Sequence, residues 1–204
     1  MSIFDPFELN PGFQSSIIAD DTEFFPLLTS EDEEEMNNEV IPEILSILPL
    51  RNTVLFPGVV IPITVGRDKS IKLIKDAYKG SRIIGVVAQK NVSIEDPEFS
   101  DLNEVGTAAY IIKMLQMPDG NTTVIIQGKK RFNLAAEISS EPYIQASVLP
   151  FEEAKLKKDK EFIALVDSLK ELSTQIIQFS PNIPTEAAIA IKNIESHSFL
   201  VNFI

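Results

Sequence analysis

The chain has 204 residues, of which 44% are hydrophobic, and this composition is ordinary for a soluble globular protein with a sizeable core. It contains no cysteine, which excludes disulfides and thiolate chemistry and fits a reducing cytoplasm, where we expect the protein to act. The first residues do not form a secretory signal, and no run of about 18 apolar residues predicts a membrane span.

The net charge of −12 is concentrated at the N-terminus. Residues 1–43 contain twelve acidic residues and no lysine or arginine, whereas the rest of the chain holds 18 acidic and 18 basic residues. A balanced body lacks the positive field that a nucleic-acid surface needs, so nucleic acid is not the expected partner. The leader shows no helical or strand period and is predicted to be disordered. Its apolar clusters IFDPFEL and TEFFPLL could dock on a partner or on the body, and a solubilising tail is the alternative.

The stretch Leu48–Pro62, LPLRNTVLFPGVVIP, is the strongest fold signal in the body of the chain. It joins two predicted strands, 44–51 and 59–65, through the turn Phe56-Pro57-Gly58. Because proline fixes φ and glycine accepts backbone geometries that other residues avoid, this spacing predicts a fixed path at a sheet edge or barrel mouth. The stretch contains no obvious reactive group, which predicts a protein that acts by shape and contact.

A single helix is predicted early in the body, at 68–79. Asp68 is its expected N-cap, and Ile71, Ile74 and Tyr78 are expected on its apolar face.

Strands dominate the rest of the body. The expected strands are 82–89, 104–117, 122–128, 131–138 and 143–149, with a hairpin turn at Pro118-Asp119-Gly120. Six or seven strands with one early helix predict an α+β fold, a small closed or half-closed barrel over residues 44–150.

Residues 151–204 have helical character. A long helix is predicted to end near Phe179, a second to begin at 184–186 and a third to be capped by Ser196. The last six residues, FLVNFI, form an apolar and uncapped end, which predicts that this helical extension belongs to a longer protein.

The motifs of catalysis are not present in the sequence. Gly128-Lys129 lacks the spacing of a phosphate loop, and the chain has no cysteine and a single histidine, His197, for which a packing role is expected. We therefore predict no catalytic, metal or cofactor-binding residue in this chain. The basic run Lys129-Lys130-Arg131 could contact RNA phosphates, but a solvated turn is the favoured interpretation.

From Ile47 to Val148 the residues resemble the N-terminal substrate-binding domain of the Lon protease family. The resemblance is carried by LPLRNTVLFPGVVIPITVGRDKSI, AQKN at 88–91, EVGTAAYI, the MPDGNTTVIIQG hairpin and KRF. It implies a PUA-like pseudobarrel of bacterial type, followed by the family's helical extension. It also implies a binding module that helps to select unfolded or tagged polypeptides for degradation in protein quality control.

In this family an ATPase module, which uses ATP and Mg, and a protease domain with a Ser–Lys dyad follow downstream, and the whole protein assembles as a homohexamer. The resemblance therefore implies that the parent chain is an ATP-dependent serine endopeptidase, although this part of it is not an enzyme. Two alternatives stay open, a stand-alone receptor of the same fold and an RNA-binding PUA-like domain.

Five residues are the predicted polypeptide contacts. They are Leu55 and Phe56 at the turn and Arg67, Lys69 and Lys72 at the start of the first helix. Exposed apolar groups at the turn would contact unfolded segments, and the charged border would limit nonspecific adhesion. The alternative for Phe56 is a plug for the barrel, and for Lys69 and Lys72 a solvated helix face.

Overall fold

The computed structural model describes residues 40–116, 122–152, 159–181, 183–184 and 186–204. Most of the predicted acidic leader and the predicted 118–120 turn lie outside these described residues. The strands are β1 (Ile44–Leu50), β2 (Val60–Val65), β3 (Ile83–Ala88), β4 (Val105–Gln116), β5 (Thr122–Ser139) and β6 (Gln145–Pro150). The helices are α3 (Asp68–Lys79), α4 (Lys160–Phe179), α5 (Glu186–Asn193) and α6 (His197–Phe203), with a short 3₁₀ turn at Phe99–Asp101.

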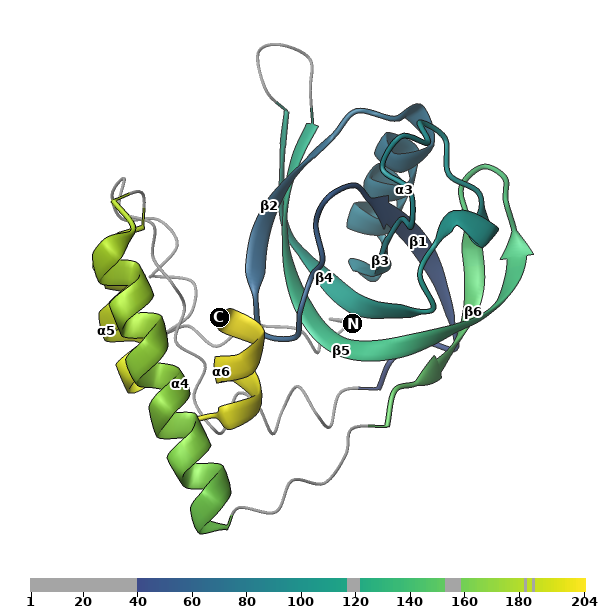
Figure 1. The fold of residues 1–204 in the computed structure, drawn as a ribbon. Coiled ribbons are helices and arrows are strands. Elements are labelled where there is room, and N and C mark those ends of the chain that lie inside the picture. Colours follow the sequence, from purple (N-terminus) through teal and green to yellow (C-terminus); the bar gives the residue numbers. More distant parts are fainter. Residues whose placement is uncertain (1–39, 117–121, 153–158, 182, 185) are drawn as a thin grey trace, which may run out of the picture.

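The six strands form one mixed sheet that closes on itself (Figure 1). Their order is β2-β5-β4-β3-β1-β6, and β6 also pairs with β5, so five strands make a ring and β2 is attached to β5 beside it. β1 and β3 run parallel, and the other pairs are antiparallel. The predicted α+β fold built on a small barrel is confirmed.

β5 is long enough to serve both parts of the sheet. Its first half pairs with β2 and its second half with β6, and register shifts mark the second half. The predicted strands 122–128 and 131–138 are therefore one strand, and the prediction of a solvated turn at Lys129-Lys130-Arg131 is wrong. All three side chains are half-buried, and the guanidinium of Arg131 lies 5.0 Å from the ring centroid of Phe151.

The N-cap of helix α3 is one residue earlier than predicted. Arg67 is the N-cap residue and Asp68 is the first helical residue, so the prediction of Asp68 as cap is wrong. The buried stripe consists of Ser70, Leu73 and Ile74, at the three- and four-residue spacing that places side chains on one helix face.

The barrel core is packed around Phe132, which is fully buried. Glycines on β3 and β4 make room for its ring. A Cβ at Gly106 would lie 2.6 Å from Phe132 Cζ, and one at Gly85 would lie 3.1 Å from the same atom and 2.6 Å from Ile47 Cδ1. The small residues of β3 and β4 are thus a packing requirement of the barrel.

The helices α4, α5 and α6 lie beside the barrel, on the side of β2 (Figure 1). They have an apolar cluster of their own, formed by Ile177, Ala187, Ile191, Ile194, Phe199 and Leu200, and Val59 packs against it from the barrel. Asp159 caps α4 and Ser196 caps α6, as predicted for the latter. His197 packs on Phe162, with ring centroids 5.2 Å apart.

Among the described residues, no helix has the length and apolarity needed to cross a membrane.

Candidate functional site

The Phe56-Pro57-Gly58 turn is fixed by hydrogen bonds to β5. Val59 N donates to Phe56 O at 3.2 Å and Gly58 has φ of 81°, the arrangement of a type II turn with proline at the second position. Gly58 N donates to Gly128 O at 2.8 Å, and Gly128 N donates to Val59 O at 2.9 Å. The turn is therefore a rigid part of the barrel rim.

The two predicted contacts at this turn have different environments. Leu55 is only 3% exposed and belongs to the barrel core, and its carbonyl accepts a hydrogen bond of 2.7 Å from Thr107 Oγ1. A polypeptide on the surface cannot reach this side chain, so we remove Leu55 from the proposed contacts. Phe56 is 40% exposed, so it does not plug the barrel, and its role as a contact remains a prediction.

The three predicted cations at the start of α3 differ in their partners. Lys69 Nζ lies 3.4 Å from Asp96 Oδ2 and 3.3 Å from Glu141 Oε1. The hydrogen bond to Glu141 and the negative charge of Asp96 raise the pKa of Lys69. Lys72 is exposed, and Arg67 is half-buried.

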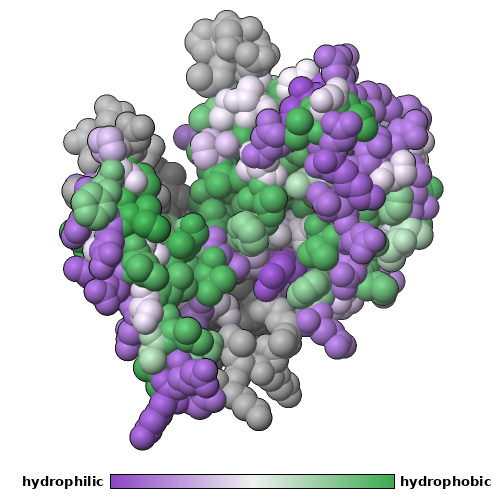
Figure 2. Space-filling model, viewed as in Figure 1, coloured by the Kyte–Doolittle hydropathy of each residue, from purple (hydrophilic) through white to green (hydrophobic). Residues whose placement is uncertain are grey.

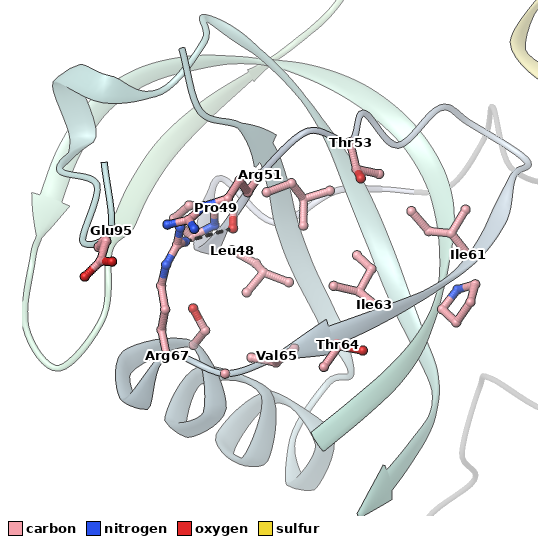
Figure 3. A pocket seen from close by; sticks show the side chains of 14 residues that line it. Leu48, Pro49, Arg51, Thr53, Ile61, Ile63, Thr64, Val65, Arg67 and Glu95 are labelled. Carbon is pink, nitrogen blue, oxygen red and sulfur yellow. Dashed lines mark hydrogen bonds between the residues drawn. The ribbon is translucent and has the colours of Figure 1, made fainter. Parts of the chain in front are cut away.

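Arg67 borders a cleft of about 740 Å³ between β1 and β2 (Figure 3). The end of β1 and the following segment form one wall, and β2 and the start of α3 form the other. The apolar side chains of Leu48, Ile63 and Val65 lie between the two strands. In this view Arg67 and Glu95 lie at one end of the cleft, and Thr53 and Ile61 lie at the other.

The strand pairing explains why the barrel is open at this position. Ile44–Ser46 of β1 pair with β6, and Ile47 N donates to Ile144 O at 2.8 Å. Among the described residues, Leu48–Leu50 pair only with β3. Within the part of the chain that the structure describes, β2 pairs only with β5. The facing edges of β1 and β2 are not joined to each other, and an open sheet edge is a template for an extended chain.

Arg67 is held in place by Gln89, which sequence reasoning missed. Arg67 Nη2 donates to Gln89 Oε1 at 2.7 Å, and Arg67 Nη1 donates to Pro49 O at 3.4 Å. Gln89 is 5% exposed, and its amide nitrogen donates to the carbonyls of Asn91 at 2.7 Å and Ile94 at 2.9 Å. The signal in the sequence that could have identified Gln89 is its position directly after a buried strand, because a buried amide side chain needs hydrogen-bond partners.

Arg51 was also missed, although it stands in the stretch that the sequence singles out. It lines the same cleft, and its Nη2 donates to Ile94 O at 3.1 Å. The structure thus brings Arg67 together with Arg51. Neither Phe56 nor Lys72 lines this cleft.

A second groove, of about 430 Å³, separates β2 from the helical extension. Its lining residues are uncharged and come from 58–61, α4, α5 and α6, and from the segment that precedes α5. Figure 2 shows hydrophobic surface where the helices face the barrel. Asn202 Nδ2 donates to Pro57 O at 3.3 Å across this junction.

Within the described ranges, no group of three or more His, Asp or Glu side chains could hold a metal ion. The cleft is lined by apolar side chains, the guanidinium groups of Arg51 and Arg67, the hydroxyls of Thr53, Thr64 and Ser70 and the carboxylate of Glu95, and it lies beside free strand edges. These groups are suited to bind a chain by contact and hydrogen bonding.

The sequence model described as the ATP-dependent protease La (LON) substrate-binding domain matches residues 44–204. A Lon protease of Flavobacterium johnsoniae is 62% identical over 185 residues, which cover 90% of this chain and 23% of that protein. A Lon protease of Cytophaga hutchinsonii is 51% identical over 183 residues, 89% of this chain and 22% of that protein. The chain belongs to the family of LON substrate-binding domains, and it spans less than a quarter of the length of these relatives.

Solved structures share the fold. The N-terminal domain of the Mycobacterium avium complex Lon protease superposes with a TM-score of 0.63 at 22% identity, over 78% of this chain and 80% of that one. A Lon N-terminal domain protein from Xanthomonas campestris superposes with a TM-score of 0.51 at 17% identity, over 74% of this chain and 89% of that one. At this identity the likeness supports the fold, and the family assignment rests on the sequence matches.

Proposed function

We propose that this chain is the polypeptide-recognition module of an ATP-dependent protease, and that the cleft between β1 and β2 is where the polypeptide binds. The open cleft beside a free strand edge carries the proposal. An unfolded chain offers main-chain hydrogen-bonding groups at every residue and apolar side chains at irregular positions. A free edge with an apolar floor accepts both, with little dependence on sequence.

The family assignment supports the wider context. We infer that the complete protein is a cytoplasmic serine endopeptidase with a Ser–Lys dyad, that it uses ATP with Mg in a separate module, and that it assembles as a homohexamer. In that setting this module selects unfolded or tagged polypeptides and has no hydrolytic activity of its own. The division into a leader at 1–43, a barrel at 44–150 and an extension at 151–204 is part of the same proposal.

Site-specific photocrosslinking tests the binding cleft. A photoreactive amino acid replaces Thr53 or Thr64, which are exposed and line the cleft, or Lys79, which is exposed at the far end of α3. Each variant is irradiated with a reduced, carboxymethylated protein that stays unfolded, and separately with the native form of the same protein. We expect crosslinks from the two cleft positions to the unfolded form only, and none from Lys79.

Equal labelling by the folded and unfolded forms, or labelling at Lys79 alone, would contradict the proposed cleft. Phe56 and Lys72 are probed in the same way, because their place among the contacts is still a prediction. Crosslinks at Phe56 without crosslinks at Thr53 or Thr64 would move the site to the turn and the apolar groove.

A further inference from the structure

The cleft has a cationic end that is preorganised. The guanidinium of Arg67 is fixed by Gln89 Oε1 at 2.7 Å and by the carbonyl of Pro49 at 3.4 Å, and the partners of Gln89 are themselves backbone carbonyls. Arg51 is held by Ile94 O at 3.1 Å. A guanidinium has five N–H donors, so both groups keep donors for a ligand. A group that is already positioned loses little entropy when the ligand binds.

The positive charge at this end has no paired carboxylate among the described residues. The hydrogen-bond acceptors of both arginines are neutral oxygens. Burial lowers the pKa of Arg67, and the charge of Arg51 lowers it further, against the opposing effect of Asp96 and Glu95. Asp96 is paired with Lys69 Nζ at 3.4 Å. Glu95 is exposed and lines the cleft at this end, but no ion pair joins it to Arg51 or Arg67 in the described part of the chain. Since arginine stays charged, a partly desolvated guanidinium whose hydrogen-bond acceptors are neutral favours an anionic ligand.

Ser70 adds a hydroxyl donor at the same end. Its residue is 7% exposed and lines the cleft, and its hydroxyl makes no side-chain hydrogen bond within the described part of the chain. Ser70 lies in the first turn of α3, whose N-cap residue Arg67 provides no side-chain cap. The N-terminus of a helix carries partial positive charge, so the arginines, the hydroxyl and the helix all favour the same sign of charge. Asp68 is in this turn but is exposed and does not line the cleft.

The free edge of β2 offers main-chain hydrogen-bonding groups to a bound chain. Pro62 faces Ile125 of β5 and has no N–H, so this pair is not hydrogen-bonded. The N–H and C=O of Thr64, two residues on, therefore also point away from β5 and towards the cleft. On the opposite wall Pro49 cannot donate, and its carbonyl already accepts from Arg67. An extended chain can pair with β2, and its end then reaches the arginines.

We propose that the cleft binds the C-terminal segment of a polypeptide as an extended strand along β2, with its α-carboxylate held by Arg51, Arg67 and Ser70. The apolar floor of Leu48, Ile63 and Val65 favours apolar side chains in the last residues of that segment. The inference rests on the proposed function and deepens it, because it names the part of a polypeptide that the cleft recognises. The ligand class is a chain that ends in apolar residues and a free carboxylate.

A pair of peptides that differ in one group tests this site. Both are short, carry fluorescein at the N-terminus and end in Val-Ile; one has a free C-terminal carboxylate and the other a C-terminal amide. Fluorescence anisotropy gives the Kd of each. Charge-assisted hydrogen bonds are the strong ones, so we expect the carboxylate form to bind about tenfold more tightly, which corresponds to about 1.4 kcal/mol.

Three variants connect the preference to the named residues. In Arg67→Gln the carboxylate form is expected to bind no better than the amide form. Arg51→Gln changes an exposed side chain and is expected to reduce the preference without disturbing the fold. Lys79→Gln removes an exposed cation of the same helix that does not line the cleft, and it should leave the preference intact. Unfolding midpoints verify that each variant is folded.

The outcomes separate this inference from the proposed function. Equal affinity of wild-type protein for the two peptides, or a preference that survives in both Arg67→Gln and Arg51→Gln, overturns the carboxylate site. Binding of unfolded protein at the cleft positions would then still support polypeptide recognition through internal segments. If the unfolded protein does not bind at all, the proposed function fails as well.

Discussion

Gly128 shows how a single residue fixes the rim of the barrel. The N–H of Gly128 donates to Val59 O, and the carbonyl of Gly128 accepts from Gly58 N, so both ends of the turn after Phe56 are bonded to this one residue. A Cβ at this position would overlap the carbonyl group of Phe56 and lie 3.2 Å from Leu55 Cγ. The turn can approach β5 this closely only because residue 128 has no side chain.

We therefore predict that Gly128→Ala destabilises the protein by about 1–3 kcal/mol, because a backbone carbonyl cannot move aside as a flexible side chain can. The matched control is Gly66→Ala, since a Cβ at Gly66 would have no atom within 4 Å. Urea denaturation followed by circular dichroism measures both. A Gly128→Ala variant as stable as Gly66→Ala would show that the turn shifts freely.

For single residues, the sequence was only partly informative about the candidate site. It identified Arg67 because a cation at the start of a helix beside a family signature is visible in the letters. It did not identify Gln89 or Ser70, because their role depends on burial and on partners distant along the chain. Leu55 was misjudged because a leucine next to a turn looks the same in sequence whether it points into the barrel or out of it.

At the scale of the elements, β2 determines which backbone groups a ligand in the cleft can reach, and the N-cap of α6 stabilises that short helix. β2 is a short edge strand with a proline, and Pro62 limits which backbone groups face the cleft. Helix α6 is only seven residues long, and it depends on its cap and its packing to be stable. The cap is Ser196, 5% exposed, whose Oγ accepts from Phe199 N at 3.0 Å.

Ser196→Ala is expected to weaken α6 by about 1 kcal/mol, because the first-turn N–H of Phe199 loses its acceptor in a buried position. Hydrogen exchange of the α6 amides, read by NMR, is the measurement, and faster exchange should be confined to the helical extension. Ser198→Ala is the control, since Ser198 is inside the helix and is not its cap. Indistinguishable exchange in the two variants would contradict a stabilising cap.

In the whole molecule, the helical extension and the barrel have separate apolar cores. The helical cluster includes Ile177 and Phe199, and Val59 packs both against it and against a barrel cluster. The barrel clusters are built mainly from strand residues and α3, with Leu55, Leu102 and Ile144 from loops. Separate cores predict two units that can lose structure independently.

Neighbouring isoleucines of α4 provide the test. Ile177 is 7% exposed and Ile176 is 62% exposed. Ile177→Asp should place an unpaired charge in the helical cluster and remove exchange protection from α5 and α6, whereas amides of β3 and β4 stay protected. Ile176→Asp should change neither region. Loss of protection in β3 and β4 as well would mean that barrel and extension unfold as one unit.

The sequence alone determined the α+β class, the early helix, the strands around residues 44–150 and the resemblance to the LON substrate-binding family, because these depend on local periodicity, turn residues and a long shared motif. Tertiary structure decided the rest. It showed that β5 is one strand, because two segments separated by a basic run continue in the same ladder. It also placed the cleft between β1 and β2, because an unjoined edge exists only once every strand has its neighbours. The grouping of Arg51, Arg67 and Ser70 follows from that closure, and no pattern in the chain specifies it.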